Sequence, residues 1–323
     1  MKNDSGIEKI IMVLLMQAFF LGSIVADQPP DAGKRPVQIR FSYSIDGYSR
    51  NMPFNSPAAF CLDEKHNELL IADTGNNAIG IFAADTGEYK GRLDSAVPLQ
   101  APCGIAIDAE DSIYVACSDS SVIEIFDFKG TNLGGIDVSG AGQKTPVKPG
   151  KLYWDGLAEE LYVIDRANQQ VLICKDRKVW QKIQPLSADA AGNADWKNAP
   201  MLQDIAVDDC GKIYVISSIG NAVAVFDRNG SPVTSFGRHG DTADTVSFPV
   251  AVSIDKKNRL WIIDNFRHCI TVFDAQGKYI TACGAYGADH GNLFFPVDII
   301  VKDGALYVLE KGAERVQVFA IVE

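Results

Sequence analysis

The sequence predicts an all-β fold, a six-bladed β-propeller with four antiparallel strands in each blade. Three observations support this prediction. A strand–turn–strand pattern recurs six times, another apolar strand precedes every copy, and no segment after the first 26 residues shows a convincing helical period. Four short strands repeated about every 40–50 residues are typical of propeller blades.

The six hairpins share one internal spacing, whereas the chain between them varies in length. In every copy, the last residue of the second strand comes nine residues after the fifth residue of the copy. Constant spacing within copies and variable gaps between them indicate rigid hairpins joined by different loops. The copies are residues 69–82, 113–126, 161–174, 213–226, 260–273 and 306–319.

Two further strands flank each hairpin. An inner strand, which begins with proline in most copies, is predicted before it, and a glycine turn with a fourth strand is predicted after it, as in 227–237 and 274–284. The predicted inner strands are residues 57–63, 102–108, 149–155, 202–208, 249–255 and 296–302.

The ends of the chain predict how the ring closes. The sixth copy reaches Glu323 just after its third strand, so its fourth strand has to come from elsewhere. The segment QIRFSYSI (Gln38–Ile45) alternates in polarity as a strand does. We expect this segment to pair with the last blade, because closure removes the exposed sheet edges that invite aggregation.

Two stretches resemble the NHL repeat: FGRHGDTADTVSFPVAVSIDKKNRLWIIDNFRHCITVFDAQG (236–277) and CGAYGADHGNLFFPVDIIV (283–301). The resemblance extends over residues 37–323 and implies the six-bladed propeller. It does not select an activity, because NHL propellers serve as RNA-binding, protein-binding, sensor and enzyme domains.

The first 26 residues predict export. Lys2 and Lys9 precede an apolar run from Ile10 to Ala26, and a polar, proline-containing stretch follows. We interpret residues 1–26 as a signal peptide cleaved after Ala26, residues 27–36 as a linker and residues 37–323 as the propeller. The alternative is an uncleaved membrane anchor, because the run is at the short limit for spanning a bilayer. Either way we expect the propeller to lie outside the cytoplasm. Cleavage would give a secreted or periplasmic protein with no stable membrane span.

The charge of the chain narrows the choice of partner. The formal net charge is -11, with a pI near 4.9 and no offsetting basic run. Such a chain repels phosphate backbones, so nucleic acid is not an expected partner. A cationic ligand or a metal ion suits this charge better.

The fifth residues of the hairpin copies predict an acidic ring. They gather on the face that carries the loops between second and third strands, with Asp204 and Asp298 expected close by. One interpretation is a funnel for an amine-bearing ligand or a divalent cation such as calcium, because carboxylate oxygens suit hard cations. The other, which we favour, is that each Asp accepts hydrogen bonds from backbone N–H groups of its own turn. The six residues are Asp73, Cys117, Asp165, Ser217, Asp264 and Glu310.

Two loops on this face are further candidates for partner binding. Phe266, Arg267 and His268 follow one another in a single turn, with Arg166 and Arg315 expected in neighbouring blades. They could grip an anionic or aromatic group, or form a solvated loop whose charges offset the acidic ring. Trp196 lies in an otherwise small and polar stretch, 185–201, where it would anchor a partner or plug a blade junction.

One pair among the seven cysteines predicts a disulfide. Counting back from the turn at 108–112 places Cys103 opposite Cys117. Directly opposed residues of antiparallel strands have Cα atoms at a distance that a disulfide accepts, and an exported protein meets an oxidising compartment. The alternatives are buried thiols that act as small apolar residues, or a two-thiol half-site for a soft metal.

The sequence favours a binding protein over an enzyme. It contains no Gly-x-Ser-x-Gly elbow and no marked nucleophile–base pair. Where a zinc-dependent lyase of NHL type places metal-binding histidines, this chain has Ala58, Cys103, Val250 and Val297. We therefore expect a binding or scaffolding module for a protein, peptide or glycan partner. The alternative is an extracytoplasmic enzyme, a lyase or metal-assisted hydrolase, with its site at the channel mouth.

Overall fold

The computed structural model describes residues 37–95, 97–139, 145–184 and 200–323. The predicted signal peptide, the linker and Trp196 lie outside these residues. Within the described residues no helix is long and apolar enough to cross a membrane.

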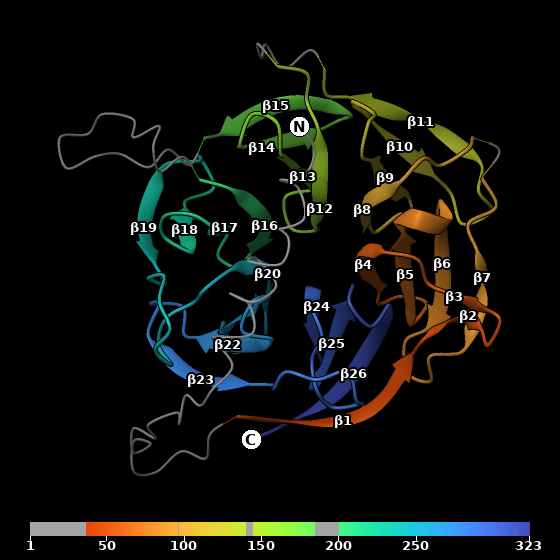
Figure 1. Cartoon of the computed structure of the whole chain (residues 1–323). Coiled ribbons are helices and arrows are strands. Elements are labelled where there is room, and N and C mark those ends of the chain that lie inside the picture. Colours follow the sequence, from red (N-terminus) through yellow and green to blue (C-terminus); the bar gives the residue numbers. More distant parts are fainter. Residues whose placement is uncertain (1–36, 96, 140–144, 185–199) are drawn as a thin grey trace, which may run out of the picture. The chain divides into compact units, whose positions relative to one another are not determined.

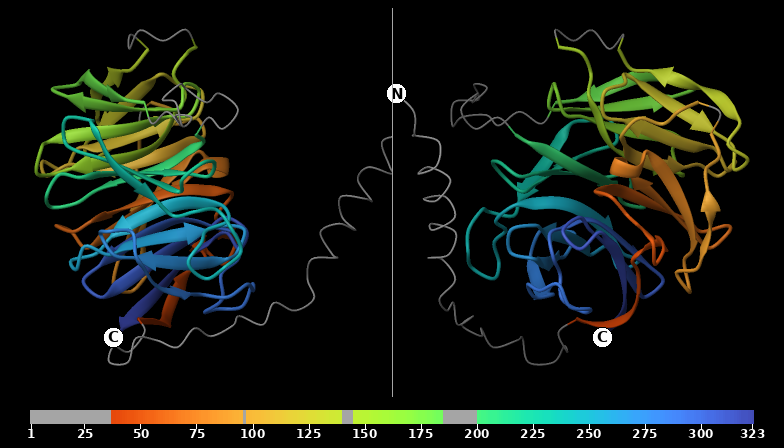
Figure 2. Two further views of the ribbon diagram at one scale, coloured as in Figure 1. Left: turned by 90° about the vertical axis from the view of Figure 1, so that its left-hand side faces the viewer. Right: turned by 45° about the vertical axis from the view of Figure 1, so that its right-hand side comes forward.

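Six four-stranded antiparallel sheets stand radially around one axis, which confirms the predicted fold (Figure 1). In side view the strands run between the two faces of the ring, so the turns gather at these faces (Figure 2). From the axis outward, the blades are β4 (Pro57–Asp63), β5 (Glu68–Asp73), β6 (Ala78–Ala83) and β7 (Tyr89–Arg92); β8 (Pro102–Ile107), β9 (Ile113–Cys117), β10 (Val122–Phe126) and β11 (Asn132–Asp137); β12 (Pro149–Asp155), β13 (Glu160–Asp165), β14 (Gln170–Lys175) and β15 (Lys178–Ile183); β16 (Leu202–Val207), β17 (Ile213–Ser217), β18 (Val223–Phe226) and β19 (Pro232–Phe236); β20 (Pro249–Ile254), β21 (Leu260–Asp264), β22 (Cys269–Phe273) and β23 (Tyr279–Cys283); and β24 (Pro296–Lys302), β25 (Ala305–Glu310), β26 (Arg315–Val322) and β1 (Gln38–Ile45).

The ring closes as the sequence predicts. Strand β1 pairs antiparallel with β26 and supplies the outermost strand of the sixth blade. Ile39 and Phe41 of β1 pack against an apolar cluster that contains Phe319. Closure therefore joins the two ends of the propeller by backbone hydrogen bonds and by buried apolar surface.

The hydrophobic core is divided among the blade junctions. Each of the six buried clusters draws its side chains from two neighbouring blades, and the cluster between the sixth and first blades includes Leu309 and Leu69. The second strands are buried along almost their whole length, because both of their faces contact a neighbouring blade. This is why they form continuous apolar runs such as IYVAC and LWIID rather than alternating patterns.

A short hairpin precedes the first blade, and the repeat pattern does not predict it. It comprises β2 (Gly47–Ser49) and β3 (Met52–Pro53). The hairpin buries Tyr48, whose hydroxyl donates a hydrogen bond of 2.9 Å to Asp73. The 3-10 helix η1 (Thr74–Asn76) follows β5.

A β-bulge recurs near the start of every inner strand and overturns one prediction. In the second blade, Ile107 faces Ile113 and Ile105 faces Val115, but Pro102 rather than Cys103 faces Cys117. The predicted opposition of Cys103 and Cys117 was therefore wrong, because the bulge adds an unpaired residue to the inner strand. Both thiols are free and buried, so the argument for a disulfide between them loses its geometric basis.

Candidate functional site

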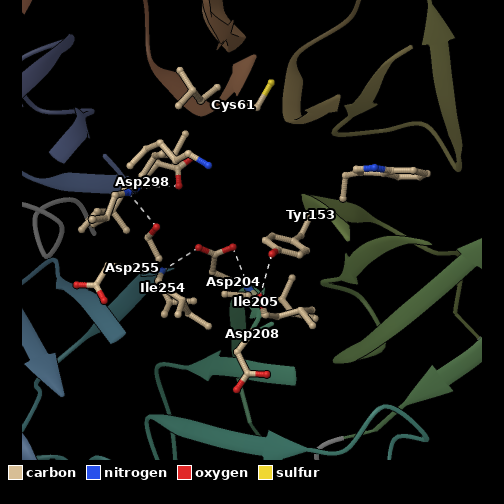
Figure 3. A pocket seen from close by; sticks show the side chains of 18 of the residues that line it. Cys61, Tyr153, Asp204, Ile205, Asp208, Ile254, Asp255 and Asp298 are labelled. Carbon is tan, nitrogen blue, oxygen red and sulfur yellow. Dashed lines mark hydrogen bonds between the residues drawn. The ribbon is translucent and has the colours of Figure 1, made fainter. Parts of the chain in front are cut away.

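A cavity of about 900 Å³ opens at one mouth of the central channel. It lies on the face that carries the turns between first and second strands, opposite the face where the sequence predicts binding residues. We call it the cup. Inner strands of all six blades line it, and Figure 3 shows part of its lining. Its members include Cys61, Lys151, Tyr153, Trp154, Asp204, Asp208, Asp209, Ile254, Asp298 and Ile300.

The floor of the cup is built from one position of the repeat. Lys151, Asp204 and Asp298 are each the third residue of an inner strand, on β12, β16 and β24. All three directly follow or lie within the recurrent bulge. Each is at least nine-tenths buried, and Lys151 forms an ion pair with Asp298 from the opposite side of the ring. Bulges commonly re-aim a side chain next to a site, and here they turn charged residues into the channel.

The two floor aspartates also satisfy backbone groups. Asp204 accepts a hydrogen bond from the N–H of Val252 in the next blade at 2.9 Å, and Asp298 accepts one from Phe60 at 3.0 Å. Inner strands are sheet edges, so their inward N–H groups have no ladder partner and need another acceptor when buried. Lys151, Asp204 and Asp298 therefore link five of the six blades. Strands β12, β16 and β24 carry these three side chains, and β20 and β4 donate backbone hydrogen bonds to the two aspartates.

The floor of the cup holds two acidic side chains and only one basic side chain. Burial raises the pKa of Asp204 to about 7, Lys151 opposes the shift and Asp298 adds to it. Burial also raises the pKa of Asp298, against the lowering effect of its Lys151 partner. Two buried carboxyl groups thus face a single ammonium group, and Asp204 can hold or release a proton near neutral pH.

The carboxylates of the cup, those of the floor included, fall into two groups. Eight carboxylates line it, and five of them form ion pairs: Glu64 with Lys302, Asp255 with Arg259, Asp298 with Lys151, Asp303 with Lys256, and Glu323 with Lys257 and Arg259. Asp204, Asp208 and Asp209 form no ion pair among the described residues, although Lys151 acts on Asp204 and the Asp208 carboxylate accepts hydrogen bonds from its own hairpin, namely from Cys210 N, Lys212 N and the Tyr214 hydroxyl. All three lie on β16 or directly after it, so the unbalanced negative charge of the cup is confined to one blade.

The predicted acidic ring lies on the other face and is engaged locally. Asp73, Asp165, Asp264 and Glu310 are fully buried. Each accepts a hydrogen bond from the loop that leads into its own blade: Asn55 N donates to Asp73, Lys148 N to Asp165, Ser247 N to Asp264 and Phe294 N to Glu310. Backbone N–H groups of their own turns, which the local interpretation predicted as donors, donate to Asp165 and Asp264, whereas the backbone donors to Asp73 and Glu310 lie in the preceding loop. The role of these four residues in binding a ligand stays a prediction.

The turn at 265–268 presents one ring to solvent and buries another. Phe266 is 61% exposed and stacks on Phe248 with ring centroids 4.4 Å apart. Arg267 donates to the carbonyl groups of Thr242 and Thr245, which ties the turn to the loop before β20. His268 is buried, and its Nδ1 accepts a hydrogen bond from the N–H of Phe295.

The two arginines predicted beside this turn lie elsewhere. Arg315 is buried in an ion pair with Glu310, and Arg166 is exposed beside Gly150 in the third blade. No contact within the described ranges joins either of them to Phe266 or Arg267.

Sequence reasoning missed Lys151 and Tyr153. Both belong to the segment PGKLYWD, which matches the repeat poorly and therefore hides the equivalence of Lys151 with Asp204 and Asp298. The signal for this equivalence is that each of the three is the third residue of its inner strand. In the described part of the chain, no group of three or more His, Cys, Asp or Glu side chains is placed to hold a metal ion.

Comparison with known proteins supports the fold. No protein family and no curated protein matches the chain in sequence. Among solved structures, an inactive virginiamycin B lyase from Staphylococcus aureus with quinupristin is 12% identical, with a TM-score of 0.60 over 88% of this chain and 99% of that one. A gluconolactonase from Xanthomonas campestris is 14% identical, with a TM-score of 0.64 over 92% and 98%. An auxiliary nutrient binding protein from Bacteroides thetaiotaomicron is 14% identical, with a TM-score of 0.61 over 84% and 70%. The chain is a six-bladed β-propeller similar in fold to lyases, a lactonase and a binding protein.

Proposed function

We propose that this chain is an exported propeller of NHL type that binds a ligand with a cationic group in the cup. The ligand would be part of a peptide or glycan partner, or a free amine. Export rests on the amino-terminal segment and NHL membership on the resemblance of residues 236–301. The acidic net charge of the chain also favours a cationic ligand.

One observation carries the proposal: three carboxylates of a concave site lack a cation. Concave sites with a few convergent polar groups and perturbed pKa values are the usual location of ligand binding. In the cup, every carboxylate outside the β16 segment has an ion pair, whereas Asp204, Asp208 and Asp209 have none with the residues that the structure describes. Of these three, Asp208 accepts hydrogen bonds from its own hairpin, so Asp204 and Asp209 carry most of the argument. A ligand ammonium or guanidinium group would supply the missing charge.

The test is calorimetric titration of the purified protein with glucosamine and with a short lysine-containing peptide. N-acetylglucosamine and the same peptide with acetylated lysine are the neutral controls. We expect binding of the cationic probes alone, and at least a roughly tenfold loss of affinity in the triple variant Asp204→Asn/Asp208→Asn/Asp209→Asn. The variant Asp303→Asn removes an ion-paired carboxylate of the same cup and should bind as the wild type does. Equal affinity for the charged and neutral probes, or no binding at all, overturns the proposal.

A second candidate is an enzyme that uses Asp204 for proton transfer. The supporting observation is that the Asp204 carboxyl group lies at the floor of an open cavity with a pKa of about 7, the range that suits a general acid or base. Mass spectrometry of the recovered probes separates the two functions, because an enzyme converts its substrate and a binding protein returns its ligand unchanged.

A further inference from the structure

We infer that the outermost strand of the third blade carries a second binding surface, which takes a linear acidic polysaccharide. This surface comprises Lys178, Trp180 and Lys182 of β15, and we call it the rim strip. Strand β15 lies at the outer edge of the ring, away from the channel (Figure 1), so the inference does not depend on the cup or on the function proposed for it. It rests on the line that the three side chains form, on the exposure of the tryptophan and on the charge beside it.

The three side chains of the rim strip lie on the outer side of one strand. Exposure alternates along β15, so that residues 178, 180 and 182 are exposed, whereas Val179 packs against the apolar cluster between the second and third blades. At roughly 3.3 Å per residue the two lysines are about 13 Å apart along the strand, with the indole between them. A chain of a few linked sugar rings can therefore contact all three side chains together.

A β-bulge presents Trp180 to solvent. In the pairing of β14 with β15, Ile173 faces Gln181 and Cys174 faces Val179, which leaves Trp180 without a partner in the ladder. The tryptophan is 52% exposed, although indole is one of the largest apolar groups in proteins. Bulges commonly re-aim a side chain next to a binding site, and this one turns an aromatic ring outward.

The same bulge recurs in all six outermost strands, but only the third blade places an aromatic residue there. In the other five blades the unpaired residue is aliphatic or polar, and in none of them do basic residues flank it on both sides at a distance of two positions. Five blades thus form the bulge without this arrangement, so folding does not account for Trp180 and its two lysines. The equivalent residues are Ser42, Lys90, Leu133, Val233 and Ile280.

The rim strip is a basic region of an acidic molecule. Of the eight residues from 175 to 182, four are Lys or Arg and one is Asp, a run too short to offset the net charge of -11. Lys178 and Lys182 are exposed and form no ion pair with any residue that the structure describes. Arg177 donates to the carbonyl group of Leu133, which extends the positive charge toward the second blade. Charges more than about 8 Å away are largely screened at physiological salt, so an anion at the strip responds mainly to these basic residues.

Protection of the sheet edge explains only the lysines. Lysines on an outermost strand hinder its pairing with other sheets, whereas an exposed tryptophan between them favours association. The two features together match a polymer of uronic acids. Its carboxylates can pair with the ammonium groups, and the C–H groups of a sugar ring can stack on the electron-rich face of the indole. The unpaired backbone groups of this edge strand can bond to the sugar hydroxyl groups.

Two other anionic partners fit the rim strip less well. Stable attachment to a bilayer takes more than one membrane-binding element, and the six outermost strands, all of which the structure describes, contain one such basic and aromatic strip. A single-stranded nucleic acid can stack a base on a tryptophan, but this acidic molecule repels its phosphate backbone. Both partners are included in the test.

Titration calorimetry at low ionic strength with hexagalacturonate tests the inference. Maltohexaose, which has the same number of sugar rings and no charge, is the control ligand. We expect hexagalacturonate to bind at least about tenfold more tightly than maltohexaose, because ammonium–carboxylate contacts are charge-assisted. Added salt should weaken the binding of hexagalacturonate, because the exposed charges are screened.

Two variants measure the contributions of charge and of the aromatic ring. Lys178→Gln/Lys182→Gln should weaken hexagalacturonate at least about tenfold, and Trp180→Ala should weaken it about fivefold through the loss of ring stacking. All three positions are exposed, so the variants should fold as the wild type does.

The control variants change equivalent groups elsewhere on the ring. Lys129→Gln/Lys278→Gln removes the same charge from exposed turns of the second and fifth blades, and Val233→Ala truncates the bulge residue of the fourth. Both should bind hexagalacturonate as the wild type does. Equal affinity for the two oligosaccharides, no binding at all, or the same loss in the control variants overturns the inference.

Parallel titrations separate this inference from other partners and from the cup. Tighter binding of phosphatidylglycerol vesicles or of oligodeoxythymidine, lost in the variants of the rim strip, would assign the strip to a membrane or to a nucleic acid and overturn the polysaccharide. The triple variant of the cup, Asp204→Asn/Asp208→Asn/Asp209→Asn, should bind hexagalacturonate with unchanged affinity. Failure of either site therefore leaves the test of the other intact.

Discussion

Lys151 is the residue on which the floor of the cup depends. Its side chain is 8% exposed and forms the ion pair that offsets the buried charge of Asp298. We expect Lys151→Met to lower the free energy of unfolding by about 3–5 kcal/mol, because removal of one partner leaves the other charge buried and unpaired. Urea unfolding measures this loss.

The matched control is Lys256→Met. Lys256 also pairs with an aspartate of the cup, Asp303, but its side chain is 74% exposed. Exposed ion pairs contribute little, so this variant should unfold almost as the wild type does. Equal losses in the two variants would show that the floor ion pair has no special role.

Asp204 makes stability depend on pH in a direction opposite to that of most carboxylates. Burial raises its pKa from 3.8 to about 7. Between these values the folded state retains a proton that the unfolded state has released, so the contribution of Asp204 to the free energy of unfolding falls as pH rises from about 4 to about 7. We expect Asp204→Asn to remove this fall. Urea unfolding across that range tests it, with the exposed Asp241→Asn as control, and an unchanged slope in Asp204→Asn would contradict the raised pKa.

At the scale of elements, β1 decides whether the propeller is closed. Without it, β26 becomes an exposed edge, and Ile39 and Phe41 no longer cover the apolar cluster beneath them. We expect a chain that lacks residues 37–46 to unfold or to oligomerise through the free edge. Light scattering measures the oligomeric state, and thermal melting measures the loss of stability. The control is Arg40→Ala, which alters an exposed residue of the same strand and should leave the protein monomeric with an unchanged melting temperature. A stable monomer after deletion of residues 37–46 would argue against ring closure as a source of stability.

The recurrent bulge is the element that the repeat pattern does not reveal. It shifts the register near the start of all six inner strands, from Pro57/Ala59 to Pro296/Asp298. A bulge changes which residues oppose one another and where the next side chain points. Hence it separates Cys103 from its predicted position opposite Cys117, and it also sets the direction of Asp204 and Asp298. The failed disulfide argument and the charged floor have the same structural cause.

At the scale of the whole molecule, the two faces of the ring differ in how they use acidic residues. On the face with the turns between second and third strands, Asp73, Asp165, Asp264 and Glu310 are buried and bond to neighbouring loops. At the cup, the three carboxylates of the fourth blade form no ion pair with any described residue, in a molecule of net charge -11. A cation that approaches the molecule is therefore attracted overall, and at the cup it meets three carboxylates that form no ion pair among the described residues.

The sequence by itself determined the number of blades, the strands within each and the closing role of Gln38–Ile45. These features depend on local periodicity and turn residues, which are readable within a single repeat. The tertiary structure decided the strand register after each proline, the face that is hollowed and the pairing of Lys151 with Asp298 across the channel. Those depend on bulges and on contacts between blades distant in the chain, and no local pattern encodes which side chain will find which partner once the ring has closed.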